Sequence, residues 1–425
     1  PPADWSGVEF NEVIPYIFPY VSSIERVTDD VVPQAIAHII KVAAMHRVTD
    51  TYGPIPYTQV GVDGQVQTAY DSQEQVYKAM FVELNQAITE LTDHQTESIS
   101  QNADLIFKGD LLKWIRFANS LMLRLAIRVR YADEALAKEY AEKAVIHPKG
   151  LITTPEDAPK MGKGAGLQMK NPLKTIRDEY NDTRMGATIY CYLQGYSDPR
   201  GAVYFNKVSG AFKAVRTGIP QTNVYGDFST PKTSEDDPLY WMKASEVLFL
   251  KAEGALAGFE MGGKAKDFYN DGVRMSFQEN GVSDADTYLA NSSYKPVNYT
   301  DSQNSSLSVE APSAITIRWN ESTDAIEENL ERIITQKYLA IYPNGQEAWT
   351  EWRRTGYPRQ IVVAENKTNA NVSTGNGFNR GGVRRLPYPR NEYDQNGANV
   401  SDAVSKYLNG TDDAATNVWW DKKYK

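Results

Sequence analysis

The sequence predicts a mainly α-helical protein in which four helix pairs alternate with long irregular segments. Apolar residues recur at steps of three and four, the segments with this pattern come in pairs, and stretches rich in Gly, Pro and Asn separate the pairs. Helix pairs of this kind stack in solenoids of the tetratricopeptide type. Their spacing is irregular and no period of about 34 residues is present, so we interpret them as divergent repeats.

The helix assignments rest on periodicity and on start signals. The predicted pairs cover about 33–49 with 72–92, 110–131 with 133–147, 239–259 with 264–279, and 324–338 with 347–354. Ser72 and Gln75 have the spacing of a capping box, and so do Asp324 and Glu327. Trp114 falls on the apolar face of its helix, which predicts that its ring is buried.

The irregular segments are expected to form a binding lobe on a helical scaffold, all within a single domain over 1–425. The scaffold is predicted over about 31–149, 239–280 and 324–357. The lobe is predicted over about 150–238, 281–323 and 358–425. Loops of this length in a compact protein are functional or disordered, and their aromatic content argues against disorder.

Composition excludes several classes of protein. The apolar runs are far shorter than the roughly 20 residues of a membrane helix. A net charge of -9 argues against nucleic acid as the partner and suits an uncharged ligand. The single cysteine, Cys191, excludes an intramolecular disulfide and is expected to be buried.

No cofactor, metal site or catalytic residue is predicted. The 4 histidines form no close ligand pair, which argues against zinc. A structural calcium ion near Asp284 and Asp286 is left open, although Asp-Ala-Asp lacks the rest of a calcium-loop pattern. Glycosidase chemistry needs two facing carboxylates, and the acidic clusters of this chain read as ion-pair, turn or cap residues.

Aromatic residues in the irregular segments are the best candidates for a ligand site. A sugar ring stacks its C–H face on an aromatic ring, and its hydroxyls need nearby polar partners. Aromatic rings held outward by turn residues, with Asn and Asp beside them, meet both needs. The candidate binding residues are Tyr57, Tyr204, Phe212, Asn223, Tyr225, Asp227 and Trp319. Burial as structural packing is an equally weighted reading of the set.

Ordered motifs give the chain a family resemblance. They include Asp50-Thr-Tyr-Gly-Pro-Ile-Pro-Tyr57, Gly109-Asp-Leu-Leu-Lys-Trp-Ile-Arg-Phe-Ala-Asn-Ser120, Gly195-Tyr-Ser-Asp-Pro-Arg200, Ala244-Ser-Glu-Val-Leu-Phe-Leu-Lys-Ala-Glu253, Glu347-Ala-Trp-Thr-Glu-Trp-Arg-Arg-Thr-Gly-Tyr-Pro358 and Val418-Trp-Trp-Asp421. With these motifs the chain resembles the SusD/RagB outer-membrane nutrient-binding lipoproteins, and especially their shorter, starch-binding-like branch. The matches run from about residue 50 to residue 421.

The resemblance implies a right-handed superhelix of four tetratricopeptide-like pairs and a ligand site in the irregular lobe. It further implies capture of an oligosaccharide or polysaccharide at the cell surface and delivery to a TonB-dependent, SusC-like transporter. The protein would be held at the outer membrane by an N-terminal lipid. The N-terminus departs from the family because it shows neither the lipid-bearing cysteine nor the usual opening segment.

Three functions remain at this point. The first is glycan capture for nutrient uptake and polysaccharide utilization, without catalysis. The second is peptide binding on the same scaffold, which would need an elongated groove with backbone partners and charged ends. The third, and least favoured, is a glycoside-directed enzyme, which would show two carboxylates facing each other across a cleft.

Overall fold

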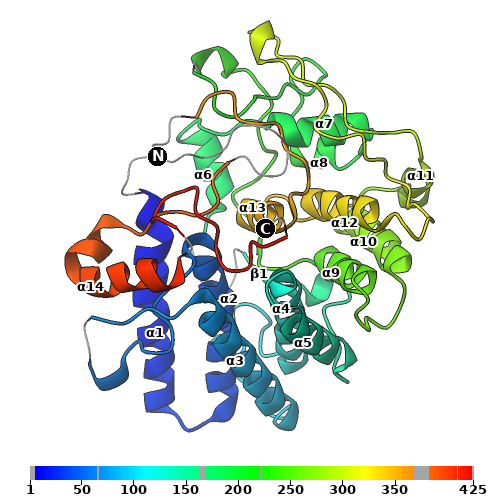
Figure 1. The fold of residues 1–425 in the computed structure, drawn as a ribbon. Coiled ribbons are helices and arrows are strands. Elements are labelled where there is room, and N and C mark those ends of the chain that lie inside the picture. The colour runs from blue at the N-terminus through cyan, green and yellow to red at the C-terminus, as the bar shows by residue number, and fades with distance from the viewer. Residues whose placement is uncertain are drawn as a thin grey trace. The chain divides into compact units, whose positions relative to one another are not determined.

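The computed structural model describes residues 5–64, 67–162, 169–220, 222–366, 382–408 and 410–423. These residues form two compact units, of which unit 1 contains 5–151 with 382–423 and unit 2 contains 152–366. Both units consist mainly of helices, as the sequence predicts (Figure 1). Because the boundary falls at Leu151, each unit contains helix pairs as well as irregular segments. The superhelix and the single domain therefore stay predictions.

Unit 1 is a row of packed helices. Its elements are η1 Trp5–Gly7, α1 Val8–Val27, α2 Val31–Tyr52, η2 Val62–Gly64, α3 Gln73–Asp93, α4 Leu111–Val129, α5 Glu134–Ile146 and α14 Arg390–Tyr407. Contacts join α1 to α2, α2 to α3, α3 to α4, and α4 to α5. Helices α1, α2 and α3 run side by side in Figure 1. The first two predicted pairs are thus confirmed as α2 with α3 and α4 with α5.

Unit 2 combines two further helix pairs with short helices and one small sheet. Its elements are η3 Pro155–Asp157, β1 Lys160–Met161, α6 Pro172–Asp178, α7 Ala187–Gly195, α8 Gly201–Tyr204, η4 Asn223–Tyr225, β2 Leu239–Tyr240, α9 Ala244–Leu256, α10 Ala265–Glu279, α11 Ala285–Ala290, η5 Ser305–Leu307, α12 Ile326–Ala340 and α13 Gly345–Thr355. Strands β1 and β2 pair antiparallel, with Lys160 opposite Tyr240. Helix α9 packs on α10 and α12.

Six of the described helices lie where the sequence predicts none, namely α1, α6, α7, α8, α11 and α14, and the three longest of them are α1, α7 and α14. Helix α1 contains Pro15 and Pro19, which disfavour a helix interior, yet it buries Phe10 and Phe18. Helices α7 and α14 lie in segments expected to be irregular. Tertiary packing outweighs weak local propensity in all three cases. The prediction that these segments are free of helix is therefore wrong.

The helix start signals are correct at one site and wrong at another. Ser72 accepts a hydrogen bond from the Gln75 amide, and the Gln75 side chain accepts one from the Ser72 amide, so the predicted capping box forms. Helix α12 instead has Ala325 at its N-cap, without a side-chain cap. Asp324 therefore does not begin that helix, which shows that the capping pattern alone does not fix a helix start.

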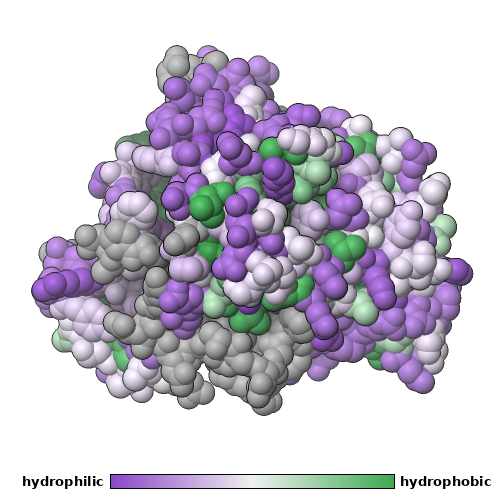
Figure 2. Space-filling view, turned by 90° about the horizontal axis from the view of Figure 1, so that it is seen from above, coloured by the Kyte–Doolittle hydropathy of each residue, from purple (hydrophilic) through white to green (hydrophobic). Residues whose placement is uncertain are grey.

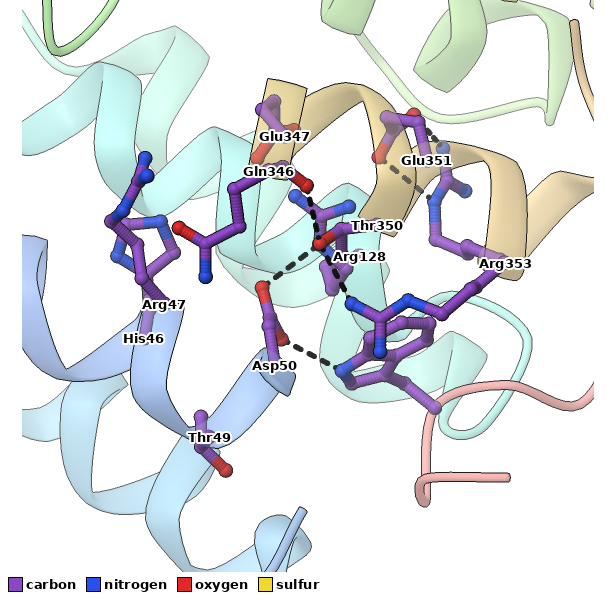
Figure 3. A network of polar contacts seen from close by, with 12 residues as sticks. His46, Arg47, Thr49, Asp50, Arg128, Gln346, Glu347, Thr350, Glu351 and Arg353 are labelled. Atoms are coloured by element: carbon purple, nitrogen blue, oxygen red, sulfur yellow. Dashed lines mark hydrogen bonds and ion pairs between the residues drawn. The ribbon is translucent and has the colours of Figure 1, made fainter. Parts of the chain in front are cut away.

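A buried carboxylate organises the interior of unit 1. Asp50 Oδ1 lies 2.5 Å from the Tyr77 hydroxyl and 2.8 Å from Trp420 Nε1, both of which donate to it. Arg128 Nε lies 3.5 Å from Asp50 Oδ2 (Figure 3). The three partners belong to α3, α4 and the C-terminal segment, so one charge of α2 links four parts of the unit.

Buried tyrosines fix the irregular segments of unit 2. Their hydroxyls donate to backbone carbonyls, as Tyr196 does to Ile315 at 3.0 Å and Tyr204 to Leu339 at 2.9 Å. Asp301 accepts from the hydroxyls of Tyr225 and Tyr299 at 3.1 and 2.8 Å. These segments are therefore ordered by long-range hydrogen bonds.

Composition predicts that Cys191 is buried and that no segment is a membrane helix. Cys191 is fully buried, and burial raises the pKa of its thiol to about 12. No helix of the described ranges has both the length and the apolar character that crossing a bilayer requires.

Replacing Trp114 by Ala should lower the free energy of unfolding by about 3–5 kcal/mol, because a large buried side chain is lost. The ring is 1% exposed, and its Nε1 donates to Asp104 Oδ2 at 2.9 Å. Chemical denaturation measures the effect. Trp5, which is 68% exposed, offers a matched control. Equal stability of Trp114→Ala and Trp5→Ala would show that the Trp114 ring is not a core residue.

Asp301 should make the stability of unit 2 fall in acid. Burial tends to raise the pKa of this carboxyl, but the Asn304 amide and the Tyr299 hydroxyl outweigh burial and hold the pKa below its ordinary value. A lowered folded-state pKa gives stability that is present above the unfolded pKa and is lost as pH falls through the folded value. Asp301→Asn should flatten this loss below about pH 4. Melting temperatures measured across acidic pH check it, and an unchanged slope would contradict the assignment.

Candidate functional site

Unit 2 contains a pocket of about 270 Å³. Its walls come from α6, α7 and the segment between them, from Phe205 after α8 and Pro231, and from α12, α13 and the turn between them. The lining residues are Leu173, Thr183, Arg184, Gly186, Ile189, Phe205, Pro231, Tyr338, Tyr342, Pro343, Asn344, Gly345 and Ala348. Most of this lining is apolar or aromatic, with a few polar groups, which is the usual make-up of a small-molecule site.

Two tyrosines contribute hydroxyl groups to the pocket. Tyr338 lies in the last turns of α12 and Tyr342 just beyond its end, four residues later. Among the described residues, neither hydroxyl has a hydrogen-bond partner. Burial raises the pKa of both hydroxyls, so they are protonated at neutral pH. Each can therefore donate one hydrogen bond to a ligand and accept others from it.

The ring of Tyr342 is held by aromatic packing from behind. Tyr204 lies with its ring centroid 4.6 Å from that of Tyr342, and Phe205 lies at 5.0 Å. Tyr204 is in turn fixed by its hydrogen bond to the Leu339 carbonyl. The aromatic wall is thus built before a ligand arrives, which limits the ordering cost of binding.

Arg184 fixes the rim of the pocket. Its Nε donates to the Tyr225 carbonyl at 3.1 Å and its Nη2 to the Gly226 carbonyl at 2.8 Å. The remaining donors reach the Thr183 carbonyl at 2.8 Å and the carbonyl and side-chain oxygen of Asn181 at 3.3 and 2.8 Å. A guanidinium has five N–H donors, so all five are used within the protein. Arg184 is a clamp between two loops and has no donor left for an anionic ligand.

The predicted outward-facing aromatic rings are mostly buried. Tyr57, Tyr204 and Tyr225 are 3%, 4% and 4% exposed. Their hydroxyls donate to Glu83, to the Leu339 carbonyl and to Asp301, respectively. The expectation that turn residues hold these rings outward is therefore wrong, because each hydroxyl finds an internal partner. Tyr57 also lies in unit 1, whereas the other candidates lie in unit 2.

Phe212 and Trp319 are half-buried and do not line the pocket. The Lys207 ammonium lies 5.2 Å from the Phe212 ring, and Trp319 packs 5.5 Å from Tyr269. Both rings thus have neighbours within the protein, and a role for them in binding stays a prediction.

Asn223 and Asp227 are exposed, and their side chains make no hydrogen bond to another described residue. They flank Tyr225 and Gly226, the residues that Arg184 clamps at the pocket rim. The structure therefore brings these two predicted polar residues close to the pocket. On the face shown in Figure 2, hydrophobic residues lie in small groups among hydrophilic ones.

Tyr338 and Tyr342 are not among the predicted binding residues. Tyr338 is predicted only as the end of a helix over about 324–338, and Tyr342 falls outside the predicted helices. The available signal is their four-residue spacing at a helix end, directly before Pro343-Asn344-Gly345. This spacing places both tyrosines at the end of α12, with Tyr338 in its last turns and Tyr342 just beyond it.

The described residues contain no group of three or more His, Cys, Asp or Glu placed to hold a metal ion. Asp286, one of the two residues considered for calcium, pairs with Arg274 at 2.8 Å.

Comparisons with known proteins identify the family. The family model described as SusD-like, Susd and RagB outer membrane lipoprotein, matches residues 1–421. A chitin-binding SusD homolog from Flavobacterium johnsoniae is 36% identical, with a TM-score of 0.92 over 97% of this chain and 86% of the other. A SusD homolog from Bacteroides uniformis is 43% identical, with a TM-score of 0.91 over 99% and 88%. A comparison with curated protein sequences gives no match. The chain therefore belongs to the SusD and RagB family of outer-membrane lipoproteins.

Proposed function

We propose that this chain is a cell-surface nutrient-binding lipoprotein that captures a glycan through the pocket of unit 2. The observation that carries the proposal is the pair of hydroxyls at Tyr338 and Tyr342, which lack protein partners within the described residues and lie in an aromatic, preformed wall. A similar structure is described as a chitin-binding SusD homolog, which supports a carbohydrate as the ligand class.

The lining suits a sugar because it offers both kinds of contact that a sugar needs. The rings of Phe205, Tyr338 and Tyr342 offer apolar area to C–H groups. The two tyrosine hydroxyls exchange hydrogen bonds with sugar hydroxyls. No Asp or Glu is among the described lining residues, whereas glycoside hydrolysis requires two carboxylates. We therefore propose binding without catalysis.

Glycan binding is favoured over peptide binding because Arg184 has no free hydrogen-bond donor. A peptide that enters by its C-terminus brings a carboxylate, which needs free donors. The five donors of Arg184 are already engaged with protein oxygens.

Delivery of the glycan to a TonB-dependent, SusC-like transporter belongs to the same proposal, as does anchoring through an N-terminal lipid. Both are supported by the family description, which names outer-membrane lipoproteins.

Replacing Tyr342 by Phe should weaken glycan binding by about 0.5–1.5 kcal/mol, the net contribution of one hydrogen bond. The melting temperature of the Tyr342→Phe variant should not change, since the Tyr342 hydroxyl has no hydrogen-bond partner among the described residues. Tyr338→Phe should behave alike. Isothermal titration of chitohexaose, maltohexaose and xylohexaose into the purified chain measures the affinity.

Tyr196→Phe is the matched control, because that buried hydroxyl donates to the Ile315 carbonyl and lies outside the pocket lining. It should lose stability and keep its affinity. Failure of the unmodified chain to bind any of the three hexasaccharides would overturn the proposed function. Unchanged affinity in both pocket variants would move the site elsewhere.

Acidic sugars should bind more weakly than neutral ones. The net charge is -9, and the only charged side chain of the described lining, Arg184, has no free donor. Burying a carboxylate without a partner costs more than about 1.4 kcal/mol, which is tenfold in affinity. Competition between hexagalacturonate and the best neutral hexasaccharide tests this. Stronger binding of hexagalacturonate would contradict the neutral-site assignment.

A further inference from the structure

Tyr180 carries an exposed aromatic ring, and residues that line the pocket lie a few positions before and after it in the sequence. Tyr180 is 72% exposed. Leu173, seven residues earlier, and Thr183, three residues later, both line the pocket. Three residues of extended chain span at most about 11 Å, so the backbone of Tyr180 lies within that distance of the Thr183 backbone. The backbone that carries the exposed Tyr180 ring is thus joined to the pocket lining within a few residues on either side.

The loop that carries Tyr180 is fixed by the structure around it. The Tyr180 amide donates to the Thr175 carbonyl at 3.3 Å, and the Asp182 amide donates to the Ile176 carbonyl at 3.2 Å. Arg184 then binds the carbonyls of Asn181 and Thr183. Because backbone hydrogen bonds lie on both sides of Tyr180, its ring stands on ordered backbone, which lowers the entropic cost of stacking a ligand on it.

The size of the pocket requires that most of an oligosaccharide lie outside it. Sites that enclose drug-sized ligands have volumes of about 300–1,000 Å³. At about 270 Å³, this pocket falls below that range, so only a small part of an oligosaccharide can lie inside it. The other residues of a bound chain must cross the rim, where Tyr180, Asn223 and Asp227 are exposed.

We infer that Tyr180 forms an outer subsite, so that a neutral oligosaccharide binds with one residue in the pocket and a following residue stacked on the Tyr180 ring. This inference rests on the proposed function. Asn223 and Asp227 stand on the loop that Arg184 joins to the Tyr180 loop, and they offer amide and carboxylate groups to hydroxyls of the outer residues. The preferred ligand is therefore an oligosaccharide, and a monosaccharide fills only the inner part of the site.

The test compares ligand lengths. The monosaccharide, disaccharide and hexasaccharide are titrated from whichever of the chito-, malto- and xylo-series binds the unmodified chain best. Affinity should rise with length. Tyr180→Ala should lower hexasaccharide affinity about tenfold, as expected for loss of a stacking surface, and leave monosaccharide affinity unchanged. Tyr20→Ala is the matched control, because Tyr20 is 67% exposed on α1, outside the pocket lining.

The outcomes distinguish a failure of the outer subsite from a failure of the proposed function. If Tyr342→Phe weakens binding while Tyr180→Ala keeps full hexasaccharide affinity, the pocket stands and the outer subsite is wrong. The subsite is also wrong if Tyr180→Ala weakens monosaccharide and hexasaccharide equally, or if Tyr20→Ala loses as much affinity. If no member of any series binds, the proposed function fails and the inference fails with it.

Discussion

A buried ion pair holds unit 2 in the arrangement on which its pocket depends. Arg200 and Asp198 have no exposed side-chain surface, and Arg200 Nη2 lies 2.6 Å from Asp198 Oδ2. The same guanidinium donates to Ser276 Oγ of α10 at 2.9 Å and to Gln336 Oε1 of α12 at 2.8 Å. Removing one member of such a pair leaves a buried charge without a partner, which costs about 3–5 kcal/mol. The pair therefore sets where the segment around α8 meets the long helices.

The ion pair is connected to the pocket through α8, the short helix between Arg200 and the aromatic wall. Arg200 directly precedes α8, and Tyr204 ends that helix. With Arg200 fixed on α10 and α12, Tyr204 reaches the Leu339 carbonyl and its ring packs on Tyr342. The buried Arg200–Asp198 ion pair thus helps to position the aromatic wall of the pocket. The second constraint is Arg184, whose N–H donors are all bound to carbonyl and amide oxygens of the protein, so that none is left for a ligand.

The helix pairs could be predicted because their signal is local. Periodicity and the Ser72 capping box mark α3 within a few residues, and the family motifs 109–120, 244–253 and 347–358 fall largely on α4, α9 and α13. Helices α1 and α14 could not be predicted, since prolines and polar residues hide segments that only tertiary packing stabilises. The local signal thus ends where packing partners lie far away in the chain.

The site was less predictable than the fold. The choice of loop aromatics led to Tyr204 and Tyr225, whose rings are buried because their hydroxyls meet partners 135 and 76 residues away. No sequence pattern announces such pairings. Asn223 and Asp227 were chosen on the same grounds and do lie near the pocket, because Arg184 ties their loop to it. Tyr338 shows the converse, because a tyrosine inside a predicted helix gives no sign in the sequence that its side chain lines a pocket.

The central claim is that one sugar residue occupies the pocket of unit 2 between its aromatic wall and its rim. A crystal structure of the chain with the best-binding neutral hexasaccharide tests this most directly. We expect density for one sugar ring in the pocket, within hydrogen-bond distance of the Tyr338 and Tyr342 hydroxyls, with the glycan chain continuing over the rim toward Tyr180. A hexasaccharide bound elsewhere, with the pocket holding only water, would contradict it.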